Sequence, residues 1–398
     1  DLEKDGLDEQ CSFPFKTLPP IAAAIGWLVV SHHRIPNMSS QGSLIQASHL
    51  LSYFQRIDST SNQAILQPLE KRDIQPYWTF SQGLPIVNKE WQKRAKRLAR
   101  RLLDASNKYP DMNWLDNLYV MHLSRLSLML ADYYYSSLNT VQERIQCQSE
   151  TNLYANTNGG KLNQTLEEHL IGVALEAGYV THSLPSLESS LPSLANHRGL
   201  RKRTTIARFK WQDKAADLAA SVRDQAREQG AFFINMASTG CGKTLANARI
   251  MYALADPQKG ARFSVALGLR TLTLQTGHAY QADRMHLDED QLAIRVGGSA
   301  SKELFEFYAK QAADTGSESR QDLMDEDGGV LFEGDYDSHP LLSRTLHRKG
   351  VKSLVAAPVL VCTVDHLTPA TETVRGGRQI APMLRLMTSD LVLDEIDD

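Results

Sequence analysis

The chain has 398 residues, enough for two to three domains. Its formal net charge of −3 excludes nucleic-acid binding through a basic excess of the whole chain, so any such contact must be local. A composition of 42% apolar and 22% charged residues excludes both a disordered chain and a membrane-embedded one.

The longest apolar run, residues 21–30, is about half as long as a membrane span requires. The four cysteines are scattered without a C-x-x-C pair, which argues against a disulfide framework and a cysteine zinc site. Both features predict a cytoplasmic protein with no membrane contact. The chain begins with Asp1 and stops at Asp398 within an acidic motif, so we expect a segment of a longer protein.

Residues 1–180 predict a mainly helical region. Apolar side chains recur at helical spacing in residues 89–104 and 120–135, and no strand-like alternation stands out. The first of these stretches is strongly basic. Residues 183–205 predict a linker, because small, polar and proline residues alternate there before a second basic cluster at 198–203.

Residues 206–398 predict an α/β domain with a parallel sheet. Short apolar runs alternate here with helical stretches, as in parallel strands that are covered by helices. Residues 314–337 interrupt this pattern with nine acids against one base and predict a solvated insertion. The predicted strands are 232–236, 263–267, 359–362 and 391–393.

The segment Ala237–Thr244 has the sequence of a phosphate-binding loop. It follows a predicted strand and opens a helix predicted from Lys243 to about Leu254, the context that such a loop requires. Its glycines allow backbone N–H groups to approach phosphate oxygens, Lys243 can reach the terminal phosphates, and Thr244 can hold Mg²⁺. The A-x-x-G-x-G-K-T form is typical of superfamily two helicases. The predicted nucleotide contacts of the loop are Ser238, Thr239, Gly240, Cys241, Gly242, Lys243 and Thr244.

Acidic residues after the last predicted strand supply the second half of a nucleotide site. Asp394 closes the apolar run 391–393 and can complete the Mg²⁺ coordination, while Glu395 can polarise the attacking water. Together with Lys243, these two acids are the predicted catalytic residues of ATP hydrolysis.

Three further elements stand in helicase order along the chain. Phe209 and Gln212 resemble an adenine-reading pair, with an aromatic ring for the face of the base and an amide for its edge. Arg270 and Gln275 resemble a P-T-R-x-L-x-x-Q motif with Gly-Leu in place of Pro-Thr. Thr363 begins a T-x-D-Q/H-L element. These motifs make Arg270, Gln275 and Thr363 the predicted contacts to a nucleic-acid strand.

Two adjacent histidines precede a remote carboxylate in the helical region. His32 and His33 follow the apolar run, and Asp132 lies about 100 residues later on a predicted helix. Two imidazoles and a carboxylate suit a divalent metal ion such as Mg²⁺, Mn²⁺, Fe²⁺ or Ni²⁺. A histidine pair at a helix end is also a common capping or surface feature, so both interpretations stay open from the residues alone.

Several runs together resemble the helicase–nuclease of type I-F CRISPR systems over nearly the whole chain. The two longest, FFINMASTGCGKTLANAR and RGGRQIAPMLRLM, are joined by runs at 18–20, 25–28 and 31–34. This resemblance implies that residues 1–182 are the C-terminal part of an HD-type metal nuclease domain. It also implies that 206–398 are the first RecA-like domain, truncated after its DExD box.

The same resemblance matches His32, His33 and Asp132 to ligands of a two-metal HD site, which would hold Mn, Fe, Ni or Co. The family's His-Asp pair, its integrase-associated domain and its second RecA-like domain find no counterpart in these residues. We therefore expect the isolated chain to bind nucleotide but to hydrolyse it weakly.

The function implied is an ATP-dependent single-stranded DNA translocase coupled to metal-dependent DNA cleavage in CRISPR interference. Its implied partners are single-stranded DNA, an RNA-guided surveillance complex and the CRISPR adaptation integrase. Candidate contacts along the DNA path are the cations at 89–101 and 198–203, with Arg378 and Arg385. Two alternatives stay open: a superfamily two translocase without nuclease activity, and a P-loop ATPase that acts on a small molecule or another protein.

Overall fold

A computed structural model of the chain describes residues 18–33, 35, 80–238, 240–281, 285–296, 339, 341–342, 349–372 and 376–395. Thr239 of the phosphate-binding loop and the acidic segment 314–337 lie outside these residues. The described residues form two compact units. One holds those up to His182 together with 376–377, and the other holds the rest, from Ser183 onward. No helix of the described part is both long and apolar enough to cross a bilayer.

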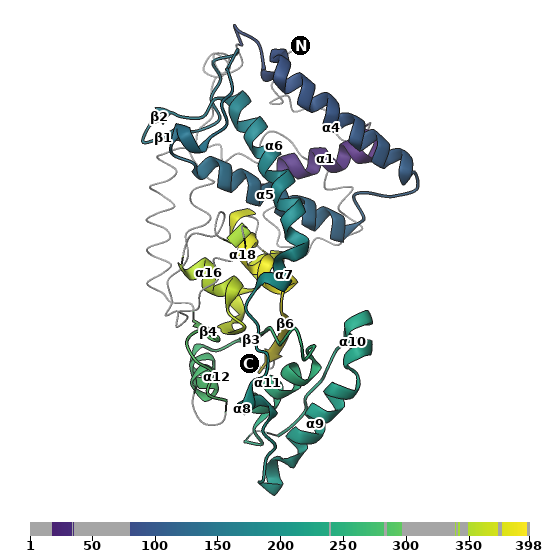
Figure 1. The fold of residues 1–398 in the computed structure, drawn as a ribbon, viewed down its shortest axis with the longest axis vertical. Helices are drawn as coiled ribbons and strands as arrows, with labels where there is room; N and C mark the ends of the chain where they lie inside the picture. The colour runs from purple at the N-terminus through teal and green to yellow at the C-terminus, as the bar shows by residue number, and fades with distance from the viewer. Residues whose placement is uncertain are drawn as a thin grey trace, which may run out of the picture. The chain divides into compact units, whose positions relative to one another are not determined.

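The first unit is helical apart from one short antiparallel strand pair (Figure 1). Its two longest helices, α4 and α5, are each preceded by an asparagine N-cap. The side chain of Asn88 accepts from the Trp91 N–H at 3.0 Å, and that of Asn117 accepts from the Val120 N–H at 3.1 Å. Each satisfies an N–H group that a helix start leaves free. The elements are α1 (Pro20–Ser31), η3 (Pro85–Val87), α4 (Lys89–Lys108), α5 (Leu118–Ser137), η4 (Val141–Glu143), β1 (Thr157–Asn158), β2 (Lys161–Leu162) and α6 (Leu166–Ser183).

Helix α5 lies in the core of this unit. Leu126 and Met129 are fully buried, and the polar residues Arg125 and Asp132 are buried with them. The guanidinium of Arg125 donates to the Ser31 carbonyl through Nε at 3.0 Å and Nη2 at 2.6 Å, which attaches α5 to the end of α1. Helix α4 has no buried residue, so its many cations remain at the surface.

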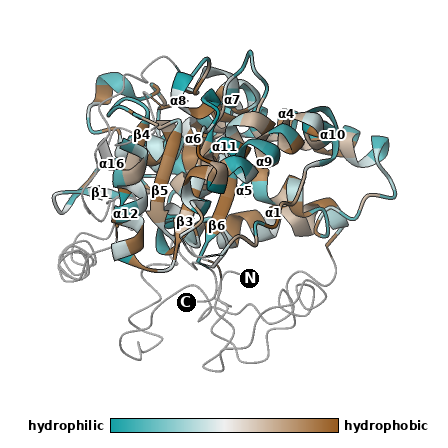
Figure 2. Cartoon of the chain, turned by 90° about the horizontal axis from the view of Figure 1, so that it is seen from below, coloured by the Kyte–Doolittle hydropathy of each residue, from teal (hydrophilic) through white to brown (hydrophobic). Residues whose placement is uncertain are grey.

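The second unit is built on a four-stranded parallel sheet of order β4-β5-β3-β6. Strands β3 and β5 are buried along their whole length, and β3, β5 and β6 are hydrophobic ribbons in Figure 2. Three of the strands coincide with predicted ones, whereas β4 was not predicted. The strands are β3 (Phe263–Leu267), β4 (Leu292–Arg295), β5 (Val359–Thr363) and β6 (Asp390–Asp394).

Helices surround this sheet. Helix α12 packs on β3, β4 and β5, and α11 packs on α9. Helix α11 runs from Lys243 to Leu254, as predicted. The helical elements of this unit are η5 (Leu184–Ser186), α7 (Leu187–Ser190), α8 (Arg198–Arg201), η6 (Ala207–Phe209), α9 (Lys210–Ser221), α10 (Arg223–Gln229), α11 (Lys243–Leu254), α12 (Arg270–Gln281), α16 (Lys349–Ala356), η7 (Val364–His366), α17 (Pro369–Glu372) and α18 (Gly376–Met387).

The strand predicted at residues 232–236 is not formed. Within the described part of the chain this segment pairs with no strand, and Phe232, Ile234 and Met236 are almost fully exposed. Residue types that favour strands are insufficient by themselves, because a strand also needs a neighbour that completes its backbone hydrogen bonds.

Residues 183–205, predicted as a linker, fold as part of the second unit. They contain η5, α7 and α8, and Leu187, Leu191 and Leu194 are buried. Leu194 and Ala261 exchange two backbone hydrogen bonds, of 2.9 and 3.0 Å. Leucines at helical spacing give this segment an apolar face, which outweighs its serine- and proline-rich composition.

Candidate nucleotide and metal sites

The phosphate-binding loop leads directly into α11. Gly240 and Gly242 have positive φ values of 76° and 80°, which residues with a side chain rarely adopt. A Cβ atom at Gly242 would lie 2.6 Å from the Gln212 Nε2 atom, so a larger residue there would also displace the Gln212 amide. Gly242 is the N-cap residue of α11, so the free N–H groups of the helix start lie at the loop.

The remaining loop residues complete the turn before the helix. The Cys241 N–H donates to the Ser238 carbonyl at 3.1 Å, and Ser238 is exposed. The Thr244 carbonyl accepts from the Tyr280 hydroxyl of α12 at 3.0 Å, which holds the start of α11 against the neighbouring helix. Lys243 and Thr244 are both half-buried in the first turn of α11.

The two acids at the end of β6 lie beside α11. Lys243 Nζ is 3.7 Å from Glu395 Oε1, and Asn247 Nδ2 donates to Asp394 Oδ2 at 3.3 Å. Because residues four apart share one face of a helix, α11 presents a cation and an amide to two consecutive acids. Asn247 was missed in the sequence, although its position four residues after Lys243 is a signal that could have found it.

The parallel register brings predicted ATP and DNA contacts to one edge of the sheet. Leu267, the last residue of β3, is in register with Thr363 on β5 and with Asp394 on β6. Arg270 and Gln275 lie on α12, which follows β3, and both are exposed. Ligands of open parallel sheets bind at the carboxyl ends of the strands, which is this edge.

Two of the residues expected to contact DNA are buried. Thr363 is 2% exposed and Arg385 is 0% exposed, so neither side chain reaches a strand at the surface. Burial lowers the pKa of Arg385 well below its ordinary value. The guanidinium instead satisfies backbone groups around the sheet. Its acceptors are the Ser264 hydroxyl and the carbonyls of Phe263, Ala357 and Pro358.

Phe209 and Gln212 lie against the phosphate-binding loop. Gln212 is 3% exposed, and both ends of its amide are engaged: Nε2 donates to the Gly242 carbonyl at 3.1 Å, and Oε1 accepts from Arg249 Nη1 at 3.5 Å. The ring of Phe209 comes within 3.5 Å of where a Cβ atom at Gly242 would stand. In this arrangement the Gln212 amide is directed at the loop backbone rather than at an open adenine site.

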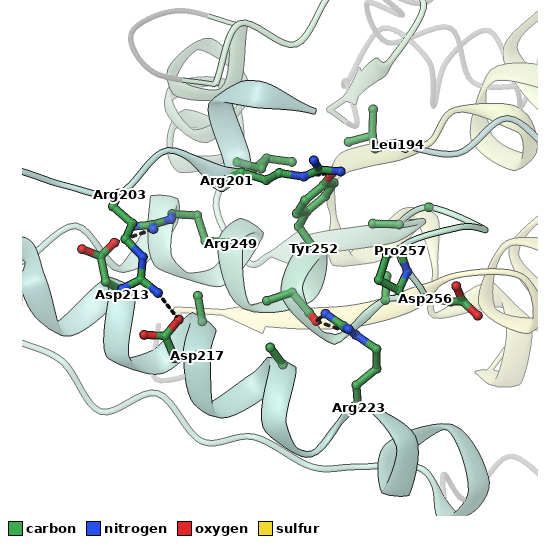
Figure 3. Close-up of a pocket in the computed structure, with 17 residues that line it drawn as sticks. Leu194, Arg201, Arg203, Asp213, Asp217, Arg223, Arg249, Tyr252, Asp256 and Pro257 are labelled. Atoms are coloured by element: carbon green, nitrogen blue, oxygen red, sulfur yellow. Dashed lines mark hydrogen bonds and ion pairs between the residues drawn. The ribbon is translucent and has the colours of Figure 1, made fainter. Parts of the chain in front are cut away.

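A cavity of ≈ 390 Å³ lies beside Asp213 and Arg249. Residues of α8, α9 and α11 contribute to its lining. Figure 3 shows two ion pairs in its wall, Arg249 with Asp213 at 2.5 Å and Arg203 with Asp217 at 2.5 Å. Burial raises the pKa of Asp213, but the hydrogen bonds from Arg249 and the Thr204 N–H, together with the charges of Arg249 and Arg203, lower it overall. Arg201 and Arg203, two of the predicted DNA-path cations, line this cavity, whereas none of the described nucleotide and metal candidates does.

A separate cluster forms in the first unit from His32, His33 and Asp132. Ligand atoms from these three residues lie within 4.8 Å of one another, and His33 Nε2 is 3.7 Å from Asp132 Oδ2. The histidines directly follow α1, whereas Asp132 lies on α5. His32 Nδ1 donates to the Val29 carbonyl at 2.6 Å, which leaves its Nε2 lone pair free for a metal ion.

The chemistry of this cluster fits a divalent cation. His33 Nδ1 and Asp132 Oδ2 are buried without a hydrogen-bond partner, an arrangement that costs free energy unless a ligand compensates it. Burial and the charge of His33 lower the pKa of His32, which favours the neutral, ligating imidazole. Burial raises the pKa of Asp132, but the hydrogen bond from His169 and the charges of the histidines lower it overall. The set therefore offers neutral nitrogen and anionic oxygen together.

Two further side chains, His169 and Gln164, hold the Asp132 carboxylate in its orientation. His169 Nε2 donates to Asp132 Oδ1 at 3.1 Å, and His169 Nδ1 lies 2.9 Å from Gln164 Oε1. Gln164 is fully buried, and its Nε2 donates to the Tyr135 carbonyl at 2.8 Å, which turns its own carbonyl oxygen toward His169. His169 was a further histidine candidate in the sequence, interpreted there as structural, and Gln164 was missed because no spacing connects it to Asp132.

Comparisons with known proteins point to one family. The chain is 49% identical over 406 residues to the CRISPR-associated nuclease/helicase Cas3 subtype I-F/YPEST of Pseudomonas aeruginosa (strain UCBPP-PA14), covering 100% of this chain and 36% of that protein. It is 43% identical over 403 residues to the protein of the same name from Pectobacterium atrosepticum, covering 97% of this chain and 36% of that protein. No protein-family model matches the chain.

A solved structure titled T. fusca Cas3-ADP aligns with 96% of this chain and 34% of its own, at 15% identity and a TM-score of 0.36, a likeness too low to support an argument. The chain spans about a third of the length of the curated relatives that it matches, 36% of each. Nearly half of all aligned positions are identical to the first relative. Through this similarity, the chain corresponds over its whole length to about a third of the subtype I-F Cas3 nuclease/helicases.

Proposed function

We propose that the chain supplies the ATP-binding part of a DNA translocase and part of the metal nuclease that the translocase serves. The observation that carries this proposal is the convergence of Lys243, Glu395 and Asp394 at the start of α11, with Lys243 Nζ 3.7 Å from Glu395 Oε1. A glycine-rich loop, a lysine and paired acids at one sheet edge are the parts that a P-loop ATPase uses. The nuclease/helicase names of the relatives support the same proposal.

Residues 206–398, the first RecA-like domain of this proposal, would bind ATP at this edge of the sheet. Lys243 leaves Glu395 and contacts the terminal phosphates, which frees the Glu395 carboxylate to orient the attacking water. Thr244 and Asp394 are the residues that would hold Mg²⁺. Bound with ATP, this ion would neutralise charge on the phosphate oxygens.

The first unit, residues 1–182 as the C-terminal part of an HD domain, would contribute to cleavage. His32, His33 and Asp132 would hold a divalent transition metal such as Mn, Fe, Ni or Co, and His169 would keep the Asp132 carboxylate in place. Such an ion supplies an activated water and a Lewis acid for a phosphodiester. The neutral imidazole favoured at His32 and the anionic carboxylate favoured at Asp132 suit this role.

Single-stranded DNA is the proposed substrate. Arg270 and Gln275 are exposed on α12 at the same sheet edge as the nucleotide site, and the cations of α4 are exposed along their helix. Such groups can follow a phosphate backbone without reading its sequence. The proposed partners are an RNA-guided surveillance complex, which would open the DNA, and the CRISPR adaptation integrase. The proposed location is the cytoplasm.

A separation of the two activities tests this proposal in a full-length protein that contains the chain. We expect Lys243→Ala to abolish ATP-driven movement on DNA and to spare metal-dependent cutting of bare single strands. We expect Asp132→Ala to stop cutting and to leave DNA-stimulated ATP hydrolysis intact. Loss of both activities in either variant would contradict two separate sites. ATP hydrolysis that single-stranded DNA does not stimulate would favour an ATPase that acts on another substrate.

The metal cluster also separates the proposal from a translocase without nuclease activity. Buried, unpartnered atoms on His33 and Asp132 favour a metal-holding role over a structural one. A full-length protein that contains the chain should therefore retain a transition metal through purification. Absence of metal binding at these residues would favour the translocase alone.

A further inference from the structure

Three side-chain donors from one segment hold three consecutive carbonyls of the phosphate-binding loop. Arg208 Nη2 donates to the Gly240 carbonyl, Trp211 Nε1 donates to the Cys241 carbonyl at 3.2 Å, and Gln212 Nε2 donates to the Gly242 carbonyl at 3.1 Å. The donors lie in η6 and at the start of α9 and therefore approach the loop from the same side. Of the three, only Gln212 was singled out in the sequence.

These contacts determine where the N–H groups of the loop point. In a trans peptide plane, the C=O of one residue and the N–H of the next residue point in opposite directions. With the carbonyls of Cys241 and Gly242 turned toward α9, the N–H groups of Gly242 and Lys243 are turned away from α9. Converging backbone N–H groups at a helix start are what a phosphate-binding loop needs.

The donors are themselves held in position. Asp213, next to Gln212, accepts from Arg249 Nη2 at 2.5 Å (Figure 3). Arg249 Nη1 also donates to Gln212 Oε1 at 3.5 Å, so the amide cannot turn freely. On the other side of the segment, the guanidinium of Arg208 stacks over the Phe209 ring at 4.9 Å from its centre. The loop is thus braced by groups that are ordered before any nucleotide arrives.

We propose that Arg208 and Trp211, together with Gln212, are positioning residues that keep the phosphate-binding loop in its binding conformation. Their role is independent of the base, because they contact the loop backbone and leave no free amide edge for adenine. This inference rests on the proposed nucleotide binding and adds to it a claim about specificity. Loss of a donor weakens the binding of phosphate groups in general rather than the binding of adenine.

The experiment compares the chain with two conservative variants, Trp211→Phe and Arg208→Gln. The first keeps an aromatic ring and removes only the N–H group, whereas the second removes the charged donor. Matched controls are Trp114→Phe, in the first unit, and Lys214→Ala, an exposed residue on α9. Calorimetry measures the affinity for Mg·ADP, Mg·GDP and Mg·pyrophosphate, and circular dichroism checks that each variant is folded.

We expect both variants to bind all three ligands about 3- to 10-fold more weakly, as expected for the loss of one hydrogen bond, with the controls unchanged. A loss confined to Mg·ADP would overturn the inference, because it would assign this segment to base recognition. Equal affinities in the chain and both variants would overturn it as well. A chain that binds none of the three ligands would instead overturn the proposed nucleotide binding itself.

Fluorescence supplies a readout that general destabilisation would not mimic. Trp211 is the only tryptophan within residues 183–398, so nucleotide-dependent emission from the second unit reports on its indole. We expect Mg·pyrophosphate, which has no base, to change this emission because it orders the loop that the indole contacts. The change should persist in Trp114→Phe and disappear in Trp211→Phe. An emission that responds to Mg·ADP but not to Mg·pyrophosphate would contradict the base-independent role.

Discussion

Lys243 and Glu395 form an ion pair across the start of α11, with Nζ 3.7 Å from Oε1. The lysine that would bind phosphate and the glutamate that would orient water are thus paired with each other when no nucleotide is present. Nucleotide binding must break this pair, so the resting structure opposes binding by the free energy of one partly exposed ion pair.

Removal of the Glu395 charge should therefore strengthen nucleotide binding. Exposed ion pairs contribute about 0.2–1 kcal/mol, so Glu395→Gln should bind Mg·ADP up to about fivefold more tightly. In a full-length protein, the same variant should hydrolyse ATP far more slowly because no carboxylate orients the water. Calorimetry and single-turnover hydrolysis measure the two effects. Glu228→Gln, an exposed residue on α10, is the control, and weaker binding by Glu395→Gln would be inconsistent with a competing ion pair.

Metal affinity should depend on His169 as well as on the ligands. Partners that orient a metal ligand typically contribute 10- to 100-fold in affinity, so His169→Ala should weaken Mn²⁺ binding by about that factor. Asp132→Asn should abolish it. Electron paramagnetic resonance of free Mn²⁺ measures binding without reference to activity. His182→Ala, an exposed histidine at the end of α6, should leave it unchanged, and full affinity in His169→Ala would show that Asp132 needs no support.

The buried Arg385 should contribute to stability rather than to DNA binding. Arg385→Met leaves several buried carbonyls without their donor and should lower the free energy of unfolding by about 3 kcal/mol or more. Lys214→Ala, on the surface of α9, should change it by less than about 0.5 kcal/mol. Urea unfolding followed by Trp211 fluorescence measures both. A stable Arg385→Met variant with weakened DNA binding would restore the expectation of a direct contact.

Much of the fold could be predicted from the sequence, because a buried strand of a parallel sheet is a contiguous run of apolar residues. Strands β3 and β5 are apolar at every position or nearly so, and α11 begins at Lys243 because Gly242 precedes it with a positive φ. Segment 232–236 has equally strand-like residues, yet it is unpaired. Pairing depends on a neighbouring strand that is remote in sequence, and local residue types carry no information about it.

In the candidate sites, the principal residues could be grouped from the sequence, whereas the residues that support them could not. The order of residue types and the family resemblance grouped His32 and His33 with Asp132, and Lys243 with Glu395, and the structure places each group's side chains close together. The supporting roles of other residues could not be assigned, since the spacing of a histidine such as His169 or an asparagine such as Asn247 does not show which group it contacts. Arg385 was misjudged for a related reason: a cation near a helicase motif suggests DNA, and only the three-dimensional structure reveals that backbone carbonyls surround it.

Stability should fall in mild acid because of His366. Burial and the nearby Arg295 lower the pKa of His366 to about 4, from an ordinary value of 6.5. Between these two pH values, the unfolded chain binds a proton at His366 that the folded chain does not bind. The contribution of neutral His366 to the free energy of unfolding is therefore fully present above pH 6.5 and is lost as the pH falls toward 4.

The difference in unfolding free energy between the chain and the His366→Gln variant isolates the effect of His366. From pH 7.5 to pH 5, the chain should lose roughly 2 kcal/mol more unfolding free energy than the variant does. Urea unfolding at the two pH values, followed by Trp211 fluorescence, measures it. Equal losses in both proteins would mean that His366 is protonated in the fold.

The binding of Mg·ATP by the chain and by Lys243→Ala tests most directly whether the start of α11 is a nucleotide site. Hydrogen bonds to charged groups contribute about 1.5–3 kcal/mol, so loss of the lysine should weaken binding by about 10- to 100-fold. Lys259→Ala, an exposed lysine away from the loop, is the matched control and should bind as the unchanged chain does. Calorimetry should find one site per chain that Lys243→Ala nearly eliminates, whereas equal affinity in Lys243→Ala and in the unchanged chain would contradict a phosphate-binding role for this residue and for the loop around it.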